Sequence, residues 1–280
     1  MKKIAFFLFV SVLMLSGCEE ASVVIHPDMN DDPQDTTSQT QQRQVLIEEF
    51  TGVRCVNCPA GSEAIENLLD AYGDQLVAIS IHSGFFAPPL SESQFDFRTT
   101  EGDNLSSFLG EPIGYPTAVV NRKLFDGEAS LQLLGQTKWA GYIADEAELP
   151  PVLELQINRE FENVTRKLTA TVTITPLENI EEEDIRLTVM ITESDIIDAQ
   201  ITPTGTIIDY SHKHVLRGSV TNYNGMILSE PLNAGSDVVK EFTYTFPEEW
   251  VATKCHVIAV VSLGGSEKDV LQAHEVGINE

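Results

Sequence analysis

Two cysteines separated by two residues form the part of this sequence best suited to chemistry. Cys55 and Cys58 follow an apolar segment, residues 45–50, and precede a helical pattern that begins at Pro59. Proline is tolerated in the first turn of a helix, so this pattern places Cys58 close to the helix start. The positive end of the helix dipole favours thiolate over thiol, which is what thiol–disulfide exchange requires.

The residues around this pair have expected roles in such an exchange. The first thiol of such a motif lies at the helix tip, so Cys55 is expected to be the exposed nucleophile. Cys58, one turn further in, is expected to resolve the mixed disulfide. Glu49, expected to be half-buried at a strand end, is a candidate to accept the proton of Cys58. Arg54 precedes the first cysteine, and its positive charge would favour the Cys55 thiolate.

The same two cysteines also fit a permanent disulfide. In that interpretation they staple an inactive domain, and Glu49 is an ordinary half-exposed strand residue. The long irregular segment 83–111 could cover the site. Accessibility of the Cys55 sulfur distinguishes the two hypotheses. An open sulfur favours exchange, whereas a buried one favours a non-enzymatic surface binding or adhesion protein.

The N-terminus has the pattern of a bacterial lipoprotein signal. Two lysines precede an apolar run, and residues 15–18 end in Cys18 and resemble a lipobox. The run is too short to cross a membrane as a helix. Residues 1–17 are therefore predicted to be a signal peptide, and Cys18 the lipidated end of a membrane-tethered chain. The compartment outside the cytoplasm permits disulfides.

The chain is strongly acidic, with 17 Lys and Arg against 43 Asp and Glu and a formal net charge of −26. Phosphate contacts cannot hold nucleic acid on such a chain, so nucleic acid is not expected as a partner. Anionic head groups would also repel it. Its membrane attachment is therefore expected to depend on the lipid of Cys18.

The remaining cysteine and the histidines are weaker candidates for chemistry. Cys255 begins an apolar run and is predicted to be an inert thiol in a buried strand. His212 and His214 lie two residues apart on a predicted strand, which makes them weak candidates for half of a metal site. Unligated histidines are commoner, and no zinc-type spacing accompanies the cysteine pair. No metal or other cofactor is expected.

Composition divides the chain into four segments. After the signal peptide, residues 18–43 are rich in Asp, Gln and Thr and are predicted to be a disordered linker. Residues 44–149 alternate apolar strands with helical patterns, which indicates an α/β domain. In residues 150–280 apolar and polar residues alternate, which predicts an antiparallel, immunoglobulin-like β-sandwich. Pro150 and Pro151 mark the boundary.

The predicted α/β domain resembles thioredoxin at three points. Glu49 and Phe50 precede the cysteine pair with the spacing of the acid–Phe pair of thioredoxins. Residues 114–117 (Gly-Tyr-Pro-Thr) resemble the cis-proline loop that faces the dithiol, and the strand and helix order agrees. The resemblance implies a cis bond before Pro116 and a loop backbone that contacts the substrate. Arg54 departs from the pattern, because thioredoxins usually have tryptophan there.

The whole chain resembles a narrower group, the thioredoxin-like outer-membrane lipoproteins of Bacteroidetes called the 28-kilodalton outer-membrane protein family. Residues 47–52 (Ile-Glu-Glu-Phe-Thr-Gly), 55–59 and 209–217 (Asp-Tyr-Ser-His-Lys-His-Val-Leu-Arg) carry this resemblance. It implies a lipid-anchored protein of the outer membrane, on its periplasmic face or at the cell surface. It implies no particular activity, and it is the cysteine pair and its neighbours that favour thiol–disulfide exchange with exported proteins or a redox partner as the function.

Overall fold

The structure, a computed structural model, describes residues 41–278. The predicted signal peptide, the lipidation site Cys18 and most of the predicted linker lie outside the described residues. None of the helices that are described is long and apolar enough to cross a membrane.

The first described residues, which we assigned to the linker, are held by the folded part. Arg43 is buried, and its guanidinium donates to Glu146 at 2.9 Å and to the carbonyl oxygen of Val270 at 3.1 Å. The backbone N–H of Leu155 donates to the side chain of Gln41 at 2.8 Å. Residues 41–43 therefore belong to the fold.

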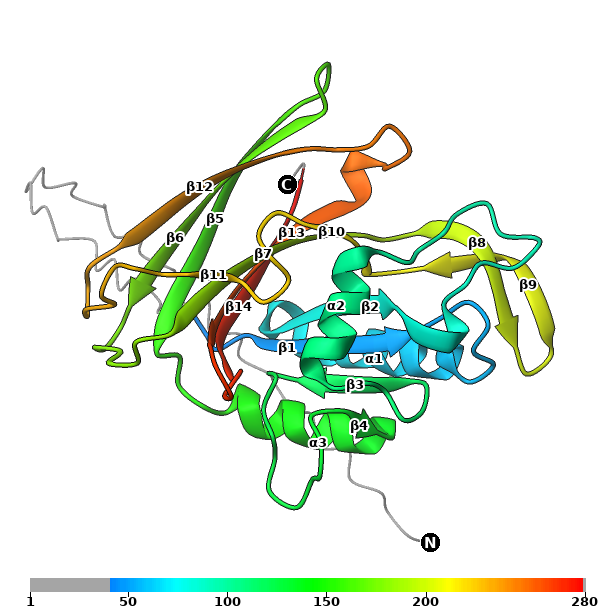
Figure 1. Cartoon of the computed structure of the whole chain (residues 1–280), viewed down its shortest axis with the longest axis horizontal. Coiled ribbons are helices and arrows are strands. Elements are labelled where there is room, and N and C mark those ends of the chain that lie inside the picture. Colours follow the sequence, from blue (N-terminus) through cyan, green and yellow to red (C-terminus); the bar gives the residue numbers. More distant parts are fainter. Residues whose placement is uncertain (1–40, 279–280) are drawn as a thin grey trace, which may run out of the picture. The chain divides into compact units, whose positions relative to one another are not determined.

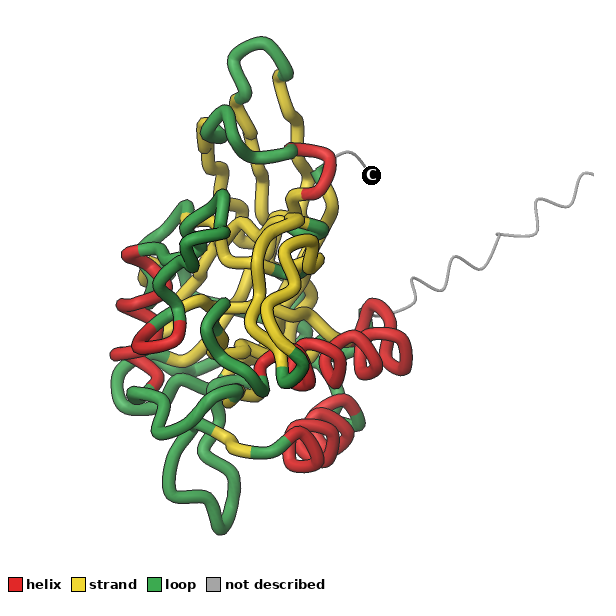
Figure 2. The backbone as a smooth tube through the Cα atoms, turned by 90° about the vertical axis from the view of Figure 1, so that its right-hand side faces the viewer, coloured by secondary structure: helices red, strands yellow, loops and turns green. Residues whose placement is uncertain are grey.

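The first half of the described chain alternates strands and helices, as predicted. Its elements are β1 (Val45–Thr51), α1 (Cys58–Tyr72), η1 (Gly73–Gln75), β2 (Leu76–His82), η2 (Gly84–Phe86), α2 (Thr100–Leu109), β3 (Thr117–Val120), β4 (Leu133–Leu134) and α3 (Gln136–Ala147). β1 and β2 are parallel and β3 is antiparallel to β1, which gives the strand order β2-β1-β3-β4. α2 packs on one face of these strands, and α1 and α3 pack on the other (Figure 1 and Figure 2).

After residue 150 the described chain consists of strands, loops and one short 3-10 helix. The elements are β5 (Leu153–Glu162), β6 (Lys167–Pro176), β7 (Ile185–Glu193), β8 (Ile196–Thr202), β9 (Gly205–His212), β10 (Val215–Ser219), β11 (Met226–Ile227), β12 (Val238–Thr245), η3 (Ala252–Lys254), β13 (Cys255–Leu263) and β14 (Val270–Gly277). β12, β6 and β5 form an antiparallel three-stranded sheet, and its apolar side chains share one core with those of β7 and β13. The fold class is therefore mixed α/β with a strand-rich second half.

One sheet runs through both halves. β10 pairs in parallel with β2, where Val215 lies opposite Ser80, so the strand order is β14-β13-β7-β10-β2-β1-β3-β4. The backbone N–H of Ser80 donates to the carbonyl oxygen of His214 at 2.7 Å. The change of sequence period near residue 150 thus marks a change in secondary structure, while the sheet continues across it.

Two consecutive glutamates of β1 are both buried, on opposite faces of the strand. Glu48 accepts two hydrogen bonds from the guanidinium of Arg122, at 2.9 and 2.7 Å, and the two side chains are 0 % and 1 % exposed. Glu49 has no such cation among the described residues, because its hydrogen bonds come from two serines. The two carboxyl groups therefore lie in very different electrostatic surroundings.

The prediction for Cys255 is confirmed. It is a free thiol at the start of β13 and is fully buried. Burial raises the pKa of this thiol to about 12, so the thiolate that reaction requires does not form near neutral pH.

Candidate functional site

Cys55 and Cys58 form a disulfide at the N-terminus of α1. Cys58 is the first residue of the helix and Pro59 the second, which agrees with the helix start predicted from the proline. Cys55 is 3 % exposed and Cys58 is 1 % exposed. The expectation that Cys55 is exposed is therefore wrong for the oxidised protein, and two covering segments explain why.

The first covering segment is the loop at residues 84–89, which Arg54 holds in place. The Arg54 guanidinium donates to the carbonyl oxygens of Pro88 at 2.8 Å and Pro89 at 2.6 Å. The backbone N–H of Arg54 donates to the carbonyl oxygen of Phe86 at 3.0 Å. A Cβ on Gly52 would lie 2.3 Å from the Phe86 carbonyl oxygen, so glycine permits this close approach. This loop, which is part of segment 83–111, therefore lies against the turn that precedes Cys55.

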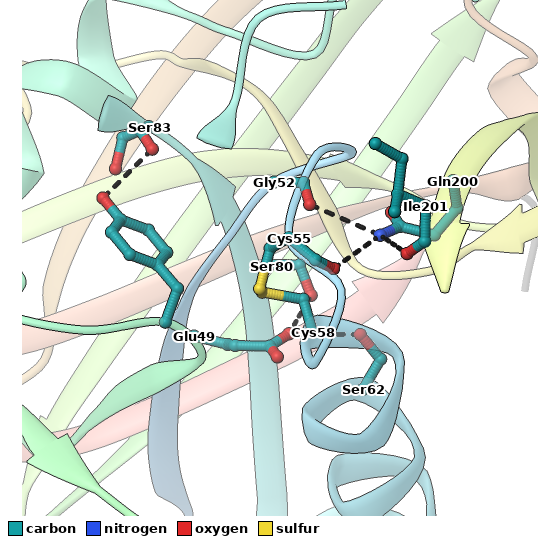
Figure 3. The surroundings of a disulfide bond; sticks show 10 residues. Glu49, Gly52, Cys55, Cys58, Ser62, Ser80, Ser83, Gln200 and Ile201 are labelled. Atoms are coloured by element: carbon teal, nitrogen blue, oxygen red, sulfur yellow. Dashed lines mark hydrogen bonds between the residues drawn. A yellow bond between two sulfur atoms is a disulfide. The ribbon is translucent and has the colours of Figure 1, made fainter. Parts of the chain in front are cut away.

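The second covering segment is the β8–β9 hairpin, which comes from the second half of the chain. The side-chain amide of Gln200 donates to the carbonyl oxygens of Cys55 at 3.1 Å and Gly52 at 3.4 Å (Figure 3). The backbone N–H of Ile201 donates to Val53 at 2.8 Å. Nothing in the sequence indicated this cover, because Gln200 lies 145 positions from Cys55.

Glu49 is fully buried, and the expectation of a half-buried side chain is wrong. Its carboxyl group points toward Cys58, Ser62 and Ser80 (Figure 3). Ser80 donates to Oε2 at 3.2 Å and Ser62 donates to the same atom at 3.5 Å, while Oε1 has no partner among the described residues. Burial raises the pKa of Glu49 to about 8, against the two serine hydrogen bonds, which lower it. The carboxyl group is therefore mostly protonated at neutral pH.

Gly61 brings three parts of the site together. The Tyr115–Pro116 bond is cis, as expected. A Cβ on Gly61 would lie 2.8 Å from the Pro116 ring and 2.6 Å from Oε1 of Glu49. The absence of a side chain thus lets α1 approach both the proline loop and the buried carboxyl group. A glycine inside a helix costs about 1 kcal/mol relative to alanine, so its presence there suggests a packing reason. Gly61 in the predicted helix was therefore the sequence signal that could have revealed the contact.

Gly61→Ala should lower the free energy of unfolding by about 1–3 kcal/mol, because neither the Pro116 ring nor the enclosed Glu49 carboxyl can move aside freely. The matched control is Gly141→Ala in α3, where a Cβ would meet nothing within 4 Å. That substitution should raise stability by up to about 1 kcal/mol through helix propensity. Urea unfolding of the oxidised proteins measures both effects. A Gly61→Ala variant as stable as wild type would refute the tight contact.

A small polar cavity of about 20 Å³ lies beside the disulfide, with room for a single water molecule. Its lining includes Cys58, Ser62, Tyr210 and two histidines, His82 and His212. The histidine rings are buried with centroids 5.7 Å apart. Burial lowers the pKa of both, that of His212 to about 4, so both are neutral at pH 7.

The two weak metal candidates do not share a site. β9 ends at His212, which packs against Phe97. His214 lies beyond the strand, with φ 53°, and its Nε2 is 3.0 Å from Glu66. The strand period that would place both rings on one face therefore stops between them. The described part of the chain contains no group of three or more His, Cys, Asp or Glu residues that could hold a metal ion.

Comparison with known proteins identifies the family. The family model described as outer membrane protein Omp28 matches residues 111–280, which is more than half of the chain. The chain belongs to the Omp28 family. The matched range of this Omp28 protein includes Pro116 and all strands of the second half, but neither Cys55 nor Cys58. Membership alone therefore does not account for the disulfide.

Solved structures give the fold of this Omp28 protein independently. HBP35 of Porphyromonas gingivalis is similar with a TM-score of 0.64 at 18 % identity, over 85 % of this chain and 76 % of that one. A crystal structure of an Agrobacterium tumefaciens protein has a TM-score of 0.51 at 14 % identity, over 86 % and 96 % of the two chains. At these identities the likeness shows a shared fold. No curated protein sequence matches the chain.

Proposed function

We propose that this Omp28 family protein carries out thiol–disulfide exchange outside the cytoplasm through Cys55 and Cys58. The observation that carries the proposal is Glu49, a fully buried carboxyl group without a cation that points toward Cys58. Burying such a group costs several kcal/mol unless it is protonated or paired. A permanent disulfide has no use for a proton donor, whereas a cysteine that leaves as a thiolate does.

The arrangement of the first half supports the same function. In our interpretation residues 44–149 form a thioredoxin-like unit, with the strand order β2-β1-β3-β4, the disulfide at the start of α1 and the cis-proline loop against that helix. Residues 150–280 would form a β-sandwich that supplies the β8–β9 cover. Cys55 is the proposed nucleophile and Cys58 the resolving thiol. Glu49 is the proposed proton donor and acceptor.

Exchange requires the cover to open, because both cysteines are buried. The hairpin is held at the cysteine turn by Gln200 and by the Ile201 backbone, and the loop is held by Arg54. We propose that a partner polypeptide displaces one of these segments. The partner would be an exported protein, since the lipobox at residues 15–18 supports anchoring of Cys18 in the outer membrane. Retention of a Cys18→Ala chain in washed membranes would contradict that anchor.

Single cysteine variants test the exchange function. Cys58→Ser leaves the Cys55 thiol, which should attack glutathione disulfide, form a mixed disulfide and release glutathione. That adduct should persist because the resolving thiol is absent. Cys55→Ser should form little adduct, because Cys58 is the deeper thiol and lies toward the Glu49 carboxyl. Intact-protein mass spectrometry measures both, with the buried Cys255→Ser as a control that changes neither.

A second candidate function is supported by the low exposure of Cys55, which is the result expected for a structural disulfide. In this alternative the protein binds a ligand or surface without catalysis. A larger cavity of about 510 Å³, lined in part by Glu66, Lys213 and His274, is where such binding would occur. Equal, slow labelling of both reduced cysteines, with no persistent adduct in either variant, would favour this alternative.

A further inference from the structure

Glu49 cannot exchange a proton directly with solvent, because it is fully buried. A proton that reaches or leaves this carboxyl group must therefore pass through the polar groups that contact it. Two hydroxyl groups do so, those of Ser80 at 3.2 Å and Ser62 at 3.5 Å. Ser80 is itself buried in β2 and also lines the small cavity beside the disulfide. Ser62 is only partly buried in α1.

From Ser62 the path continues to Tyr210. Tyr210 lines the same small cavity as Ser62, and interaction with Ser62 opposes the rise that burial causes in the pKa of the Tyr210 phenol. Tyr210 lies near the end of β9, in the hairpin that covers the disulfide, and is partly exposed. The chain of groups from the interior to the surface is therefore Glu49, Ser62 and Tyr210.

The 20 Å³ cavity lies along this path, since Cys58, Ser62 and Tyr210 all line it. Its size admits one water molecule. Two buried nitrogen atoms of cavity-lining residues, Nδ1 of His82 and Nε2 of His212, have no partner among the described residues. Other titratable groups near the path, on β2, β9, the residue after β9 and α1, are His82, His212, Lys213, Glu63 and Glu66.

We propose that Ser62 and Tyr210 are positioning residues that carry protons between solvent and Glu49 while the Cys55–Cys58 disulfide is exchanged. The proposal rests on the exchange function proposed above. When the thiolate of an external dithiol attacks Sγ of Cys55, a mixed disulfide forms and the Cys55–Cys58 bond breaks. The electron pair goes to Sγ of Cys58, which takes the proton of Glu49. The second thiol of the dithiol then releases Cys55, so the dithiol is oxidised and the protein is reduced.

Glu49 regains its proton from Ser62, Ser62 regains one from Tyr210, and Tyr210 regains one from solvent. Removing either hydroxyl group should interrupt this transfer. Reduction of the full chain by dithiothreitol, followed from pH 6 to 9, should slow at least about tenfold in Ser62→Ala and Tyr210→Phe, part of the roughly 10²–10⁴-fold that general acid–base catalysis provides. The slowing should be greatest near and above pH 8, where Glu49 starts deprotonated and must first gain its proton along the path, and smallest at pH 6, where Glu49 already holds the proton that it donates.

Two further variants separate transfer from structure. Ser80→Ala removes the other hydroxyl hydrogen bond to Glu49, which lowers the pKa of Glu49, so it should shift the pH profile of the reduction to higher pH and slow the rate less than Ser62→Ala does. Ser62→Thr keeps the hydroxyl group and should restore the wild-type pH profile. Equal slowing in Ser62→Ala and Ser80→Ala would overturn the proposal, because it would indicate only a perturbed Glu49.

A measurement on the oxidised protein is independent of exchange. After a rapid pH jump, infrared absorption of the protonated carboxyl group, assigned with Glu49→Gln, reports how fast Glu49 gains its proton. Ser62→Ala and Tyr210→Phe should slow this step at least about tenfold, again well within the range of acid–base effects. If Ser62→Ala and Tyr210→Phe slow proton uptake by Glu49 but the cysteine variants form no glutathione adduct, the path is supported and the exchange function is not. Unchanged infrared rates in both variants would overturn the path even if exchange occurs.

Discussion

Arg122→Ala should lower the free energy of unfolding of this protein by about 3–5 kcal/mol, the range typical of removing one partner of a buried ion pair. Its guanidinium is 1 % exposed and forms two hydrogen bonds with Glu48, which is 0 % exposed. Truncation would leave the Glu48 carboxylate buried without a partner in the middle of β1. The loss in unfolding free energy is measured by urea denaturation at neutral pH.

Two controls make this result specific. Arg98→Ala breaks an ion pair of similar length with Asp96, but those side chains are 44 % and 43 % exposed. Its effect should stay below about 1 kcal/mol because water replaces the lost partner. The double variant Glu48→Leu with Arg122→Met should recover most of the stability, since no charge is then left buried. A double variant as unstable as Arg122→Ala would show that packing, and not the unpaired carboxylate, causes the loss.

Glu49→Gln should stabilise the protein at alkaline pH and have little effect in acid. Burial raises the folded pKa of Glu49 to about 8, against an ordinary value of 4.5. Between these pH values the unfolded chain ionises Glu49 and the folded protein does not, so stability falls as pH rises. The stability that wild-type protein has with Glu49 protonated is fully present below pH 4.5 and is lost by the time pH has risen through about 8. The loss is on the order of 5 kcal/mol, from the difference between 4.5 and about 8 at about 1.4 kcal/mol per pKa unit.

The measurement is the difference in unfolding free energy between Glu49→Gln and wild type from pH 4 to pH 9. Subtracting the two curves cancels the other titrating groups. Glu128 is a control of opposite sign, because its hydrogen bond with Lys138 lowers its pKa. Glu128→Gln should therefore give no gain at alkaline pH. A flat difference curve for Glu49→Gln would mean that Glu49 ionises normally in the folded protein.

The parts of the site that were predictable depend on local sequence. The cysteine spacing and Pro59 predicted the position of the disulfide, because the N-terminal turn of a helix has few acceptable sequences. The cis bond before Pro116 followed from a four-residue resemblance. The burial of Cys255 followed from its position in an apolar run of residues. Each of these predictions used a short motif and the segments next to it in the sequence.

The parts that were missed depend on contacts across the chain. Gln200 contacts the turn of Cys55 from the second half of the chain, and this contact leaves no trace in local hydrophobic pattern. The loop held by Arg54, by contrast, lies in segment 83–111, which was expected to be able to cover the site. Glu49 was expected to be half-buried because it lies near the end of a predicted strand. In the structure β1 is covered on both faces, so both of its glutamates are enclosed. The pattern of apolar and polar residues cannot show that Glu48 pairs with a cation and Glu49 does not.

Ser80 takes part both in the pairing of the two halves and in the hydrogen bonding of Glu49. Its backbone N–H holds β10, at the start of the pairing between the two halves, while its hydroxyl group holds the Glu49 carboxyl. A displacement of β10 that moved Ser80 would therefore be expected to change the pKa of Glu49, because the Ser80 hydroxyl group lowers that pKa. Because such coupling is reciprocal, ionisation of Glu49 must in turn alter how strongly the two halves hold together.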